Sequence, residues 1–191
     1  AAGVPVRALT RDPDSAALPA NVEVVTGDFT RPDSLEHALQ GIGAVFLLWT
    51  APPDTVAAVV ERLAAEPRRV GVLSSPLHTP HPFFQQPNPS RAMAEQIERL
   101  IESSSLQWTF LRPGMFAANT LRWWAPQIRA GDTVRWPYLS APTAPIDERD
   151  IAAVPLLAHE AGRRAIVAAA GRRCSAISTE ALDDAGHVVS R

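Results

Sequence analysis

Apolar residues along the first part of the chain alternate between short strand-like runs and longer helical patterns. The runs Val4–Thr10 and Asn21–Phe29 are rich in valine and end in turn residues, which predicts two strands. Ala44–Trp49 is continuously apolar, as expected of a strand buried on both faces of a parallel sheet. Two more strands are predicted at Arg68–Ser75 and Leu106–Gly114.

Helical periodicity occupies the segments between the later strands. Apolar residues recur at helical spacing between Pro32 and Gly41, in Pro52–Glu66 and in Ser90–Ser104. The order is strand, strand, helix, strand, helix, strand, helix, strand. It predicts an α/β fold with a doubly wound, mostly parallel sheet, right-handed crossovers and helices on both faces.

Composition and charge narrow the class of protein. The chain has 191 residues, 46% hydrophobic and 20% charged, which is typical of one globular domain. A net charge of −2 gives no basic surface for nucleic acid, and no apolar run approaches the roughly 18–20 residues that span a bilayer. No secretory signal is recognisable at the start, and the single Cys174 fits a reducing compartment, so a cytoplasmic location is predicted.

Candidate binding residues follow the predicted strands, because ligands of doubly wound sheets lie at the carboxyl ends of the strands. Arg11 follows the first strand and is suited to bind a phosphate. Asp28 follows the second and can accept hydrogen bonds from an adenine amino group, with Phe29 flanking the ring. The alternative is that Arg11 is a solvated loop residue and that Asp28 caps the following helix.

Several sequence words, in order, resemble one known family. They are VRALTRDP, VEVVTGDFTRPDSLEHALQGIGAVFLL, VGVLSS, AEQIERLIESSSLQWTFLRPGMF and IDERDIAAV. From Val4 to about Val154 the chain resembles the NmrA-like group of the atypical short-chain dehydrogenase/reductase superfamily. The resemblance implies an NAD(P)-binding, Rossmann-like domain over residues 1–154. The residues that follow, 155–191, lose the family pattern and are expected to form a small, irregular C-terminal lobe.

The resemblance also implies roles for individual residues. Arg11 would meet the adenosine 2′-phosphate, which favours NADP over NAD as the cofactor, and Asp28 and Phe29 would line the adenine. Further cofactor contacts are implied for residues at the later strand ends and at the start of the third helix: Trp49, Thr50, Ala51, Ser74, Ser75, Arg91, Pro113 and Gly114.

The chain departs from the superfamily at the catalytic positions. Reductases of the superfamily use a Tyr-x-x-x-Lys pair, in which tyrosine is the general acid; here these positions are Pro87 and Arg91. Because proline cannot donate a proton, carbonyl reduction by that mechanism is disfavoured. Ser75 and His78 remain the candidate catalytic residues. His78 and His81 lack a third ligand at a telling spacing, so no metal site is predicted.

A second departure concerns the start of the fold. The family opens with a strand, a glycine-rich turn and a helix whose N-terminus receives the pyrophosphate. Only Ala1–Gly3 precede the Val4 strand. That strand therefore corresponds to the family's second one, and a Rossmann-like fold truncated at its N-terminus is expected.

Aromatic residues gather in the later part of the chain and predict a substrate pocket for a flat quinone or aromatic carbonyl compound. They are Phe116, Trp123, Trp124, Trp136 and Tyr138. Packing between the sheet and the C-terminal lobe is the alternative. Three functions stay open: NADPH-dependent reduction of a quinone or carbonyl compound, non-catalytic redox sensing with NADP and a protein partner, or a remnant without activity.

Overall fold

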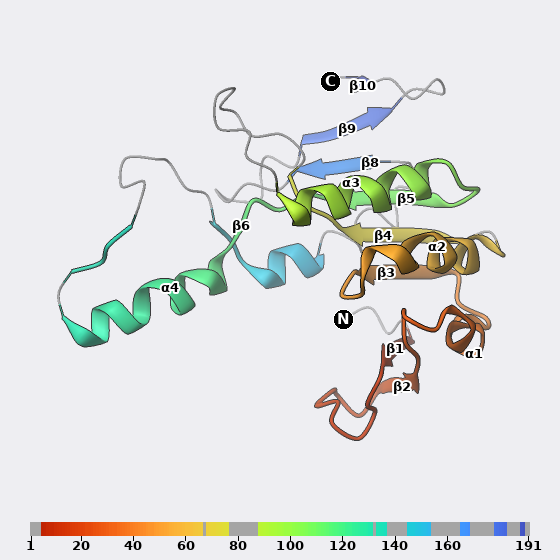
Figure 1. The fold of residues 1–191 in the computed structure, drawn as a ribbon, viewed down its shortest axis with the longest axis horizontal. Coiled ribbons are helices and arrows are strands. Elements are labelled where there is room, and N and C mark those ends of the chain that lie inside the picture. Colours follow the sequence, from red (N-terminus) through yellow and green to blue (C-terminus); the bar gives the residue numbers. More distant parts are fainter. Residues whose placement is uncertain are drawn as a thin grey trace.

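The computed structural model describes residues 5–66, 68–76, 88–131, 133–136 and 145–153, together with the backbone of three strands at 165–168, 178–182 and 188–189. It is a layered α/β arrangement in which helices lie against a sheet (Figure 1). The predicted fold class is confirmed. The predicted domain boundary at residue 154 stays a prediction.

The main sheet has six strands in the order β10-β9-β8-β5-β4-β3. Its centre consists of β3 (Ala44–Leu48), β4 (Arg69–Leu73) and β5 (Gln107–Leu111), which are parallel and aligned over five residues each. β8 (Ala165–Ala168) continues the parallel part; β9 (Ser178–Leu182) pairs antiparallel with β8, and β10 (Val188–Val189) pairs antiparallel with β9. Parallel strands of this kind bring their carboxyl ends to one edge of the sheet.

Two smaller pairs of strands accompany the main sheet. β1 (Val6–Thr10) and β2 (Val22–Thr26) form a parallel pair of their own, which is not hydrogen-bonded to β3. β6 (Met115–Phe116) pairs in parallel with β7 (Pro145–Ile146). The five predicted strands up to β5 are confirmed.

The three predicted helices are also present. Short 3-10 turns, η1 (Pro32–Ser34) and η2 (Pro53–Thr55), open α1 (Leu35–Leu39) and α2 (Val56–Ala64), with proline in their first turns. α3 (Pro89–Glu102) begins at Asn88, whose Oδ1 accepts from the N–H groups of Ser90 and Arg91 at 3.0 and 3.2 Å.

A further helix, α4 (Ala117–Ala130), is not predicted by the sequence pattern. It contains Pro126 and buries none of its residues. It extends away from the sheet (Figure 1), and a short helical segment at 148–153 follows β7. The Glu148 carboxylate accepts from the Ala118 N–H at 3.1 Å and so caps the first turn of α4.

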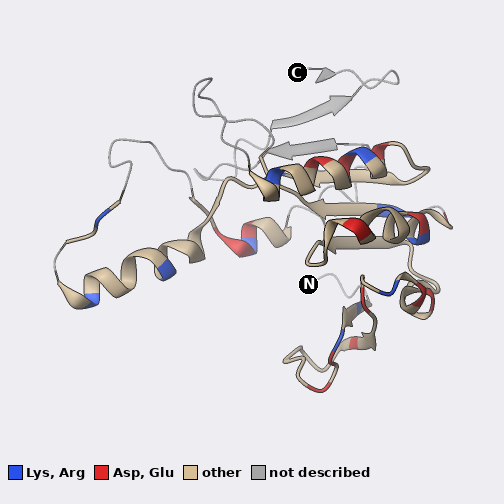
Figure 2. Ribbon diagram, in the orientation of Figure 1, with Lys and Arg blue, Asp and Glu red and all other residues tan. Residues whose placement is uncertain are grey.

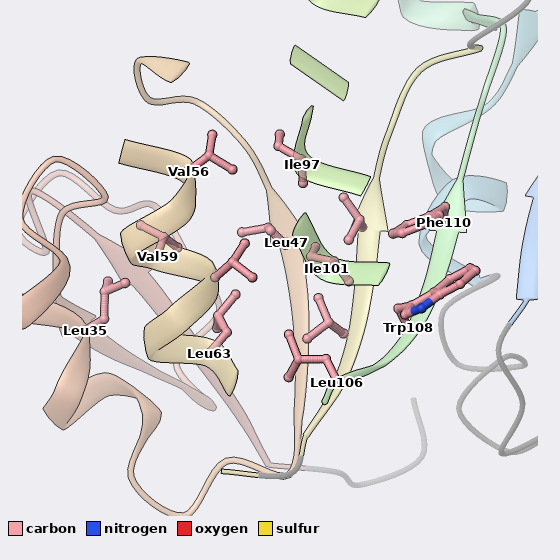
Figure 3. Packing of buried hydrophobic residues seen from close by; sticks show 13 residues of the cluster. Leu35, Leu47, Val56, Val59, Leu63, Ile97, Ile101, Leu106, Trp108 and Phe110 are labelled. Atoms are coloured by element: carbon pink, nitrogen blue, oxygen red, sulfur yellow. The ribbon is translucent and has the colours of Figure 1, made fainter. Parts of the chain in front are cut away.

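The hydrophobic core lies between the main sheet and the helices α2 and α3 (Figure 3). The register puts Leu47, Val72 and Phe110 side by side on the face that these helices cover. Apolar residues from both helices complete it: Val56, Val59, Val60, Leu63, Ile97 and Ile101. α2 and α3 also carry charged residues (Figure 2), of which only Glu98 is buried, in keeping with the amphipathic patterns of the two helices.

Arg68, immediately before β4, ties together three chain segments at the amino ends of the strands. Only 5% of this residue is exposed. Its guanidinium donates to the carbonyls of Leu39, Ile42 and Leu63 at 3.0–3.1 Å and to Glu66 Oε2 at 2.7 Å. These carbonyls belong to the ends of α1 and α2 and the start of the β3 segment, where helical hydrogen bonding runs out.

We expect Arg68→Met to lower the free energy of unfolding by about 2–4 kcal/mol, because several partly or fully buried carbonyls lose their donor together. The midpoint of urea unfolding measures this. Arg62→Ala is the matched control, since Arg62 forms an exposed ion pair with Asp33, and it should change stability by no more than about 0.5 kcal/mol. Equal midpoints for the two variants would contradict the role assigned to Arg68.

Candidate functional site

The carboxyl ends of the strands gather most of the residues that the sequence singles out. β1 ends beside Arg11, β2 beside Asp28 and Phe29, β3 beside Trp49, and β4 beside Ser74. β1–β2 and the main sheet are separate ladders, so this gathering depends on contacts between side chains and loops.

Asp28 is fixed by a tight turn after β2. Its Oδ1 accepts from the Thr30 N–H at 2.8 Å, and its own N–H donates to Ser34 Oγ at 2.9 Å. The hydrogen bonds from Thr30 are the largest causes that hold the pKa of Asp28 below its usual range, and the positive charges of Arg11 and Arg31 add to the effect. Asp28 is therefore anionic at neutral pH with an exposed arginine, Arg11, nearby.

Gly27 allows β2 to turn against β1. Its N–H donates to the Thr10 carbonyl at 2.9 Å, and a Cβ at this position would lie 2.3 Å from Leu9 Cδ1. The absence of a side chain thus lets the ends of β1 and β2 stay close, which keeps Arg11 and Asp28 together.

Phe29 and Trp49 form an aromatic pair that joins the two ladders. Their ring centroids are 5.1 Å apart and the planes differ by 2°, which is an offset stack. Trp49 is oriented by its own indole N–H, which donates to the Ala51 carbonyl at 2.7 Å. Because the rings touch each other, a third ring has no room between them and would have to stack on an outer face.

A buried carboxylate lies under the ends of β4 and β5. Glu98 on α3 is 2% exposed and accepts from Ser74 Oγ at 2.5 Å and from Arg112 Nε at 2.9 Å. A second bond from Arg112 Nη2 to Glu98 Oε2 makes the ion pair bidentate. The Ser74 N–H donates to the Leu111 carbonyl at 2.7 Å, so backbone and side chains both join the two strand ends.

The Glu98–Arg112 pair is the part of this edge that sequence reasoning missed. The sequence pattern places Arg112 within the predicted strand Leu106–Gly114 and Glu98 within the predicted helix Ser90–Ser104, and gives neither a separate role. Their positions carried a signal: Glu98 falls between Ile97 and Ile101 on the apolar side of α3, where an unpaired carboxylate would be costly.

Three of the predicted substrate residues, Trp123, Trp124 and Trp136, lie apart from the carboxyl ends of the strands. Trp136 contacts Trp123 and Trp124, with ring centroids 5.2 and 5.6 Å apart, so three of the aromatic residues do form a cluster. Phe116 stands at the start of α4, and Trp124 is eight residues further on, about 12 Å along the helix axis. α4 carries the tryptophan cluster away from the sheet (Figure 1).

The remaining candidates have varied positions. Thr50 and Ala51 lie just after β3, and Ser75 lies just after β4. After β5, Pro113 is buried and Gly114 is exposed. Arg91 is half-buried in the first turn of α3. His78 and Tyr138, with His81, lie outside the described residues. The roles proposed for all these residues stay predictions.

The fold, together with the residues gathered at the carboxyl ends of its parallel strands, defines a nucleotide-binding α/β protein of the Rossmann type. The model of the NAD(P)H-binding family matches residues 1–136, and the chain belongs to this family. The match confirms the predicted family relationship and the cofactor class, NAD(P)(H).

Curated relatives and solved structures agree with this assignment. The chain is 37% identical over 161 residues to the (4-alkanoyl-5-oxo-2,5-dihydrofuran-3-yl)methyl phosphate reductase of Streptomyces griseus, covering 81% of the chain and 54% of the relative. It is 32% identical to the NAD(P)H azoreductase of Xenophilus azovorans, covering 82% and 55%. A nucleoside-diphosphate-sugar epimerase from Staphylococcus aureus has the same fold, with a TM-score of 0.67, 15% identity and coverage of 87% of this chain and 62% of that one.

The chain spans about half the length of the curated relatives it matches. Among the helices of the described part of the chain, none is both long and apolar enough to cross a membrane.

We expect Glu98→Leu to lower the free energy of unfolding by about 3 kcal/mol, because Arg112 loses its buried counter-ion and Ser74 loses its acceptor. Glu102→Gln, one turn further along α3 on an exposed residue, is the matched control and should shift stability by at most about 0.5 kcal/mol. Urea unfolding of both variants gives the comparison. A Glu98→Leu protein as stable as the control would show that the network does not hold the strand ends.

Proposed function

We propose that NADP(H) binds along the carboxyl ends of β1, β2 and β3, with its adenosine end beside Arg11, Asp28 and Phe29. The observation that carries this proposal is the joint placement of a cation, an ordered carboxylate and a stacked aromatic pair at one edge of a Rossmann-type sheet. These groups suit a phosphate, an amino group and a flat base respectively.

The proposal includes a preference for NADP(H) over NAD(H). Arg11 is exposed, follows β1 directly and lies close enough to Asp28 to affect its pKa. A carboxylate at this position disfavours the extra negative charge of a 2′-phosphate unless a cation compensates it, and Arg11 is that cation. The outer face of the Phe29–Trp49 pair is the proposed stacking surface for adenine.

We propose further that the whole protein is an NADPH-dependent reductase of a small organic acceptor such as a quinone or carbonyl compound. The two curated relatives are named as reductases, which supports this class of reaction. The nicotinamide cofactor supplies a hydride, and the acceptor then needs a proton. Pro87 cannot provide it, so an acceptor that takes hydride readily, such as a quinone, fits this sequence better than a simple ketone.

The same observation favours a second candidate, a redox-sensing regulator that binds NADP(H) and a protein partner without turnover. Pro87 and Arg91 occupy the positions of the superfamily's catalytic tyrosine and lysine. A protein with this replacement keeps the binding edge and loses the general acid. Turnover separates the two candidates, because only the reductase oxidises NADPH when a quinone is added.

We expect Arg11→Ala to weaken NADPH binding about 10- to 100-fold and to leave NADH binding unchanged, because only the 2′-phosphate loses a charge-assisted hydrogen bond. Calorimetric titration of the protein with each cofactor measures both affinities. Arg122→Ala on α4 removes an equal charge away from the edge and serves as the control. Equal loss for NADPH and NADH, or no loss, would contradict the role of Arg11.

A further inference from the structure

Ser74, at the carboxyl end of β4, has both of its hydrogen-bond donors committed to the protein. Its hydroxyl group donates to Glu98 Oε1 at 2.5 Å, and its backbone N–H donates to the Leu111 carbonyl at 2.7 Å. The direction of the first bond is fixed, because a carboxylate in an ion pair with a guanidinium accepts hydrogen bonds and donates none. Toward a bound molecule, Ser74 can therefore act only as an acceptor.

Glu98 holds the Ser74 hydroxyl group in this one orientation. Only 2% of Glu98 is exposed, and Arg112 donates to the same Oε1 from Nε at 2.9 Å and to Oε2 from Nη2. A buried carboxylate with two bonds to a guanidinium has little freedom to rotate, and losing the serine as a partner is costly in a buried site. The ion pair thus fixes the direction of a hydroxyl group as well as the positions of two strand ends.

The proposed cofactor site leads along the sheet to this serine. Stacking of Phe29 on Trp49 brings the ends of β2 and β3 together, and the sheet continues from β3 to β4 and β5 (Figure 1). Neighbouring strands are about 4.8 Å apart. A dinucleotide with its adenosine at β1 and β2, following the strand ends past β3, brings its nicotinamide to the ends of β4 and β5. Ser74 is half-buried there, whereas Glu98 beneath it is closed off.

Hydrogen-bond chemistry selects the group that an acceptor-only serine can hold. The nicotinamide ring carries a carboxamide, whose NH₂ group is a donor. A quinone or ketone offers only carbonyl oxygens, which need a donor, and the Ser74 hydrogen is directed to Glu98. Ser74 therefore suits the cofactor and not the hydride acceptor.

We propose that Ser74 accepts a hydrogen bond from the nicotinamide carboxamide of bound NADP(H), and that Glu98 is the positioning residue that orients the Ser74 hydroxyl group for this contact. This role of Ser74 rests on the proposed function, because the path of the cofactor starts at the proposed adenosine site. The contact fixes the rotation of the nicotinamide ring about its bond to the ribose. It thereby sets which face of the ring is turned to the acceptor.

The same geometry bears on the missing general acid. Pro87 cannot protonate the reduced acceptor, and Ser74 does not replace it, because its hydrogen is bonded to Glu98. Both residues therefore favour an acceptor that takes hydride with little help from a protein acid.

The test compares oxidised NADP with its acetylpyridine analogue, in which an acetyl group replaces the carboxamide and removes its N–H donors. Calorimetric titration of the full chain gives both affinities. The unchanged protein should bind the analogue about tenfold more weakly, because Ser74 loses its donor. Ser74→Ala should bind the two molecules equally. A purely structural role of Ser74 would change both affinities together and leave their ratio as it was.

Two further serine variants serve as controls. Ser74→Thr keeps a hydroxyl group at this position and should keep the preference for NADP over the analogue. Ser103→Ala removes a hydroxyl group that donates to the Arg99 carbonyl at 2.8 Å, at the end of α3 that lies near the start of β5. It should leave both affinities unchanged. Loss of the preference in Ser103→Ala, or its persistence in Ser74→Ala, would show that another group reads the carboxamide.

Variants of Glu98 test the positioning role. Glu98→Gln should reduce the preference to less than about threefold, because the new amide can donate to the Ser74 oxygen and compete with the carboxamide. Glu98→Asp keeps the charge opposite Arg112 but is one carbon shorter, so it releases the hydroxyl group and should also reduce the preference. Circular dichroism establishes which of the two variants folds. A full preference in a folded variant would mean that Glu98 does not orient Ser74.

Adenosine 2′,5′-bisphosphate distinguishes failure of this contact from failure of the proposed cofactor site, because it has the adenine and the 2′-phosphate but no nicotinamide. If it binds, and Arg11→Ala weakens it, while the unchanged protein binds NADP and the analogue equally, the adenosine site stands and the Ser74 contact is wrong. If neither the bisphosphate nor NADP binds, both are wrong. Equal weakening of NADP and the analogue by Ser74→Ala would mean that Ser74 meets a ribose hydroxyl group instead.

Discussion

The parallel register of β3, β4 and β5 is the constraint on which the other features depend. Because residues such as Leu47, Val72 and Phe110 are aligned across three strands, one face is apolar throughout and takes α2 and α3. The same alignment ends all three strands at one edge. The residues that follow these strands, such as Trp49 after β3 and Ser74 after β4, therefore lie at the same edge of the sheet.

Buried ionic groups hold the two ends of this sheet. At the amino ends, Arg68 binds carbonyls that the ends of α1 and α2 leave without helical partners. At the carboxyl ends, Glu98 receives the Ser74 hydroxyl and the Arg112 guanidinium. Both groups are costly to bury and therefore specify one arrangement of the loops around them.

Local patterning was enough to predict the strands and helices up to β5, because alternation, helical periodicity and proline at helix starts agree in each segment. It also indicated Arg11 and Asp28, since both directly follow strands. Local patterning could not predict contacts between distant segments, because the stacking of Phe29 on Trp49 and the Glu98–Arg112 ion pair depend on tertiary packing. α4 was missed because Pro126 interrupts its pattern, and with it the position of the tryptophan cluster away from the sheet.

The proposed cofactor site is tested most directly by two-dimensional NMR of backbone amides, which maps where NADPH perturbs the protein. We expect the largest chemical-shift changes at the carboxyl ends of β1, β2 and β3, around Arg11, Asp28, Phe29 and Trp49. The chemical shifts of amides in the C-terminal half of α4 should stay unchanged. Shifts confined to α4, or none at millimolar cofactor, would contradict the assignment of the cofactor site to this edge.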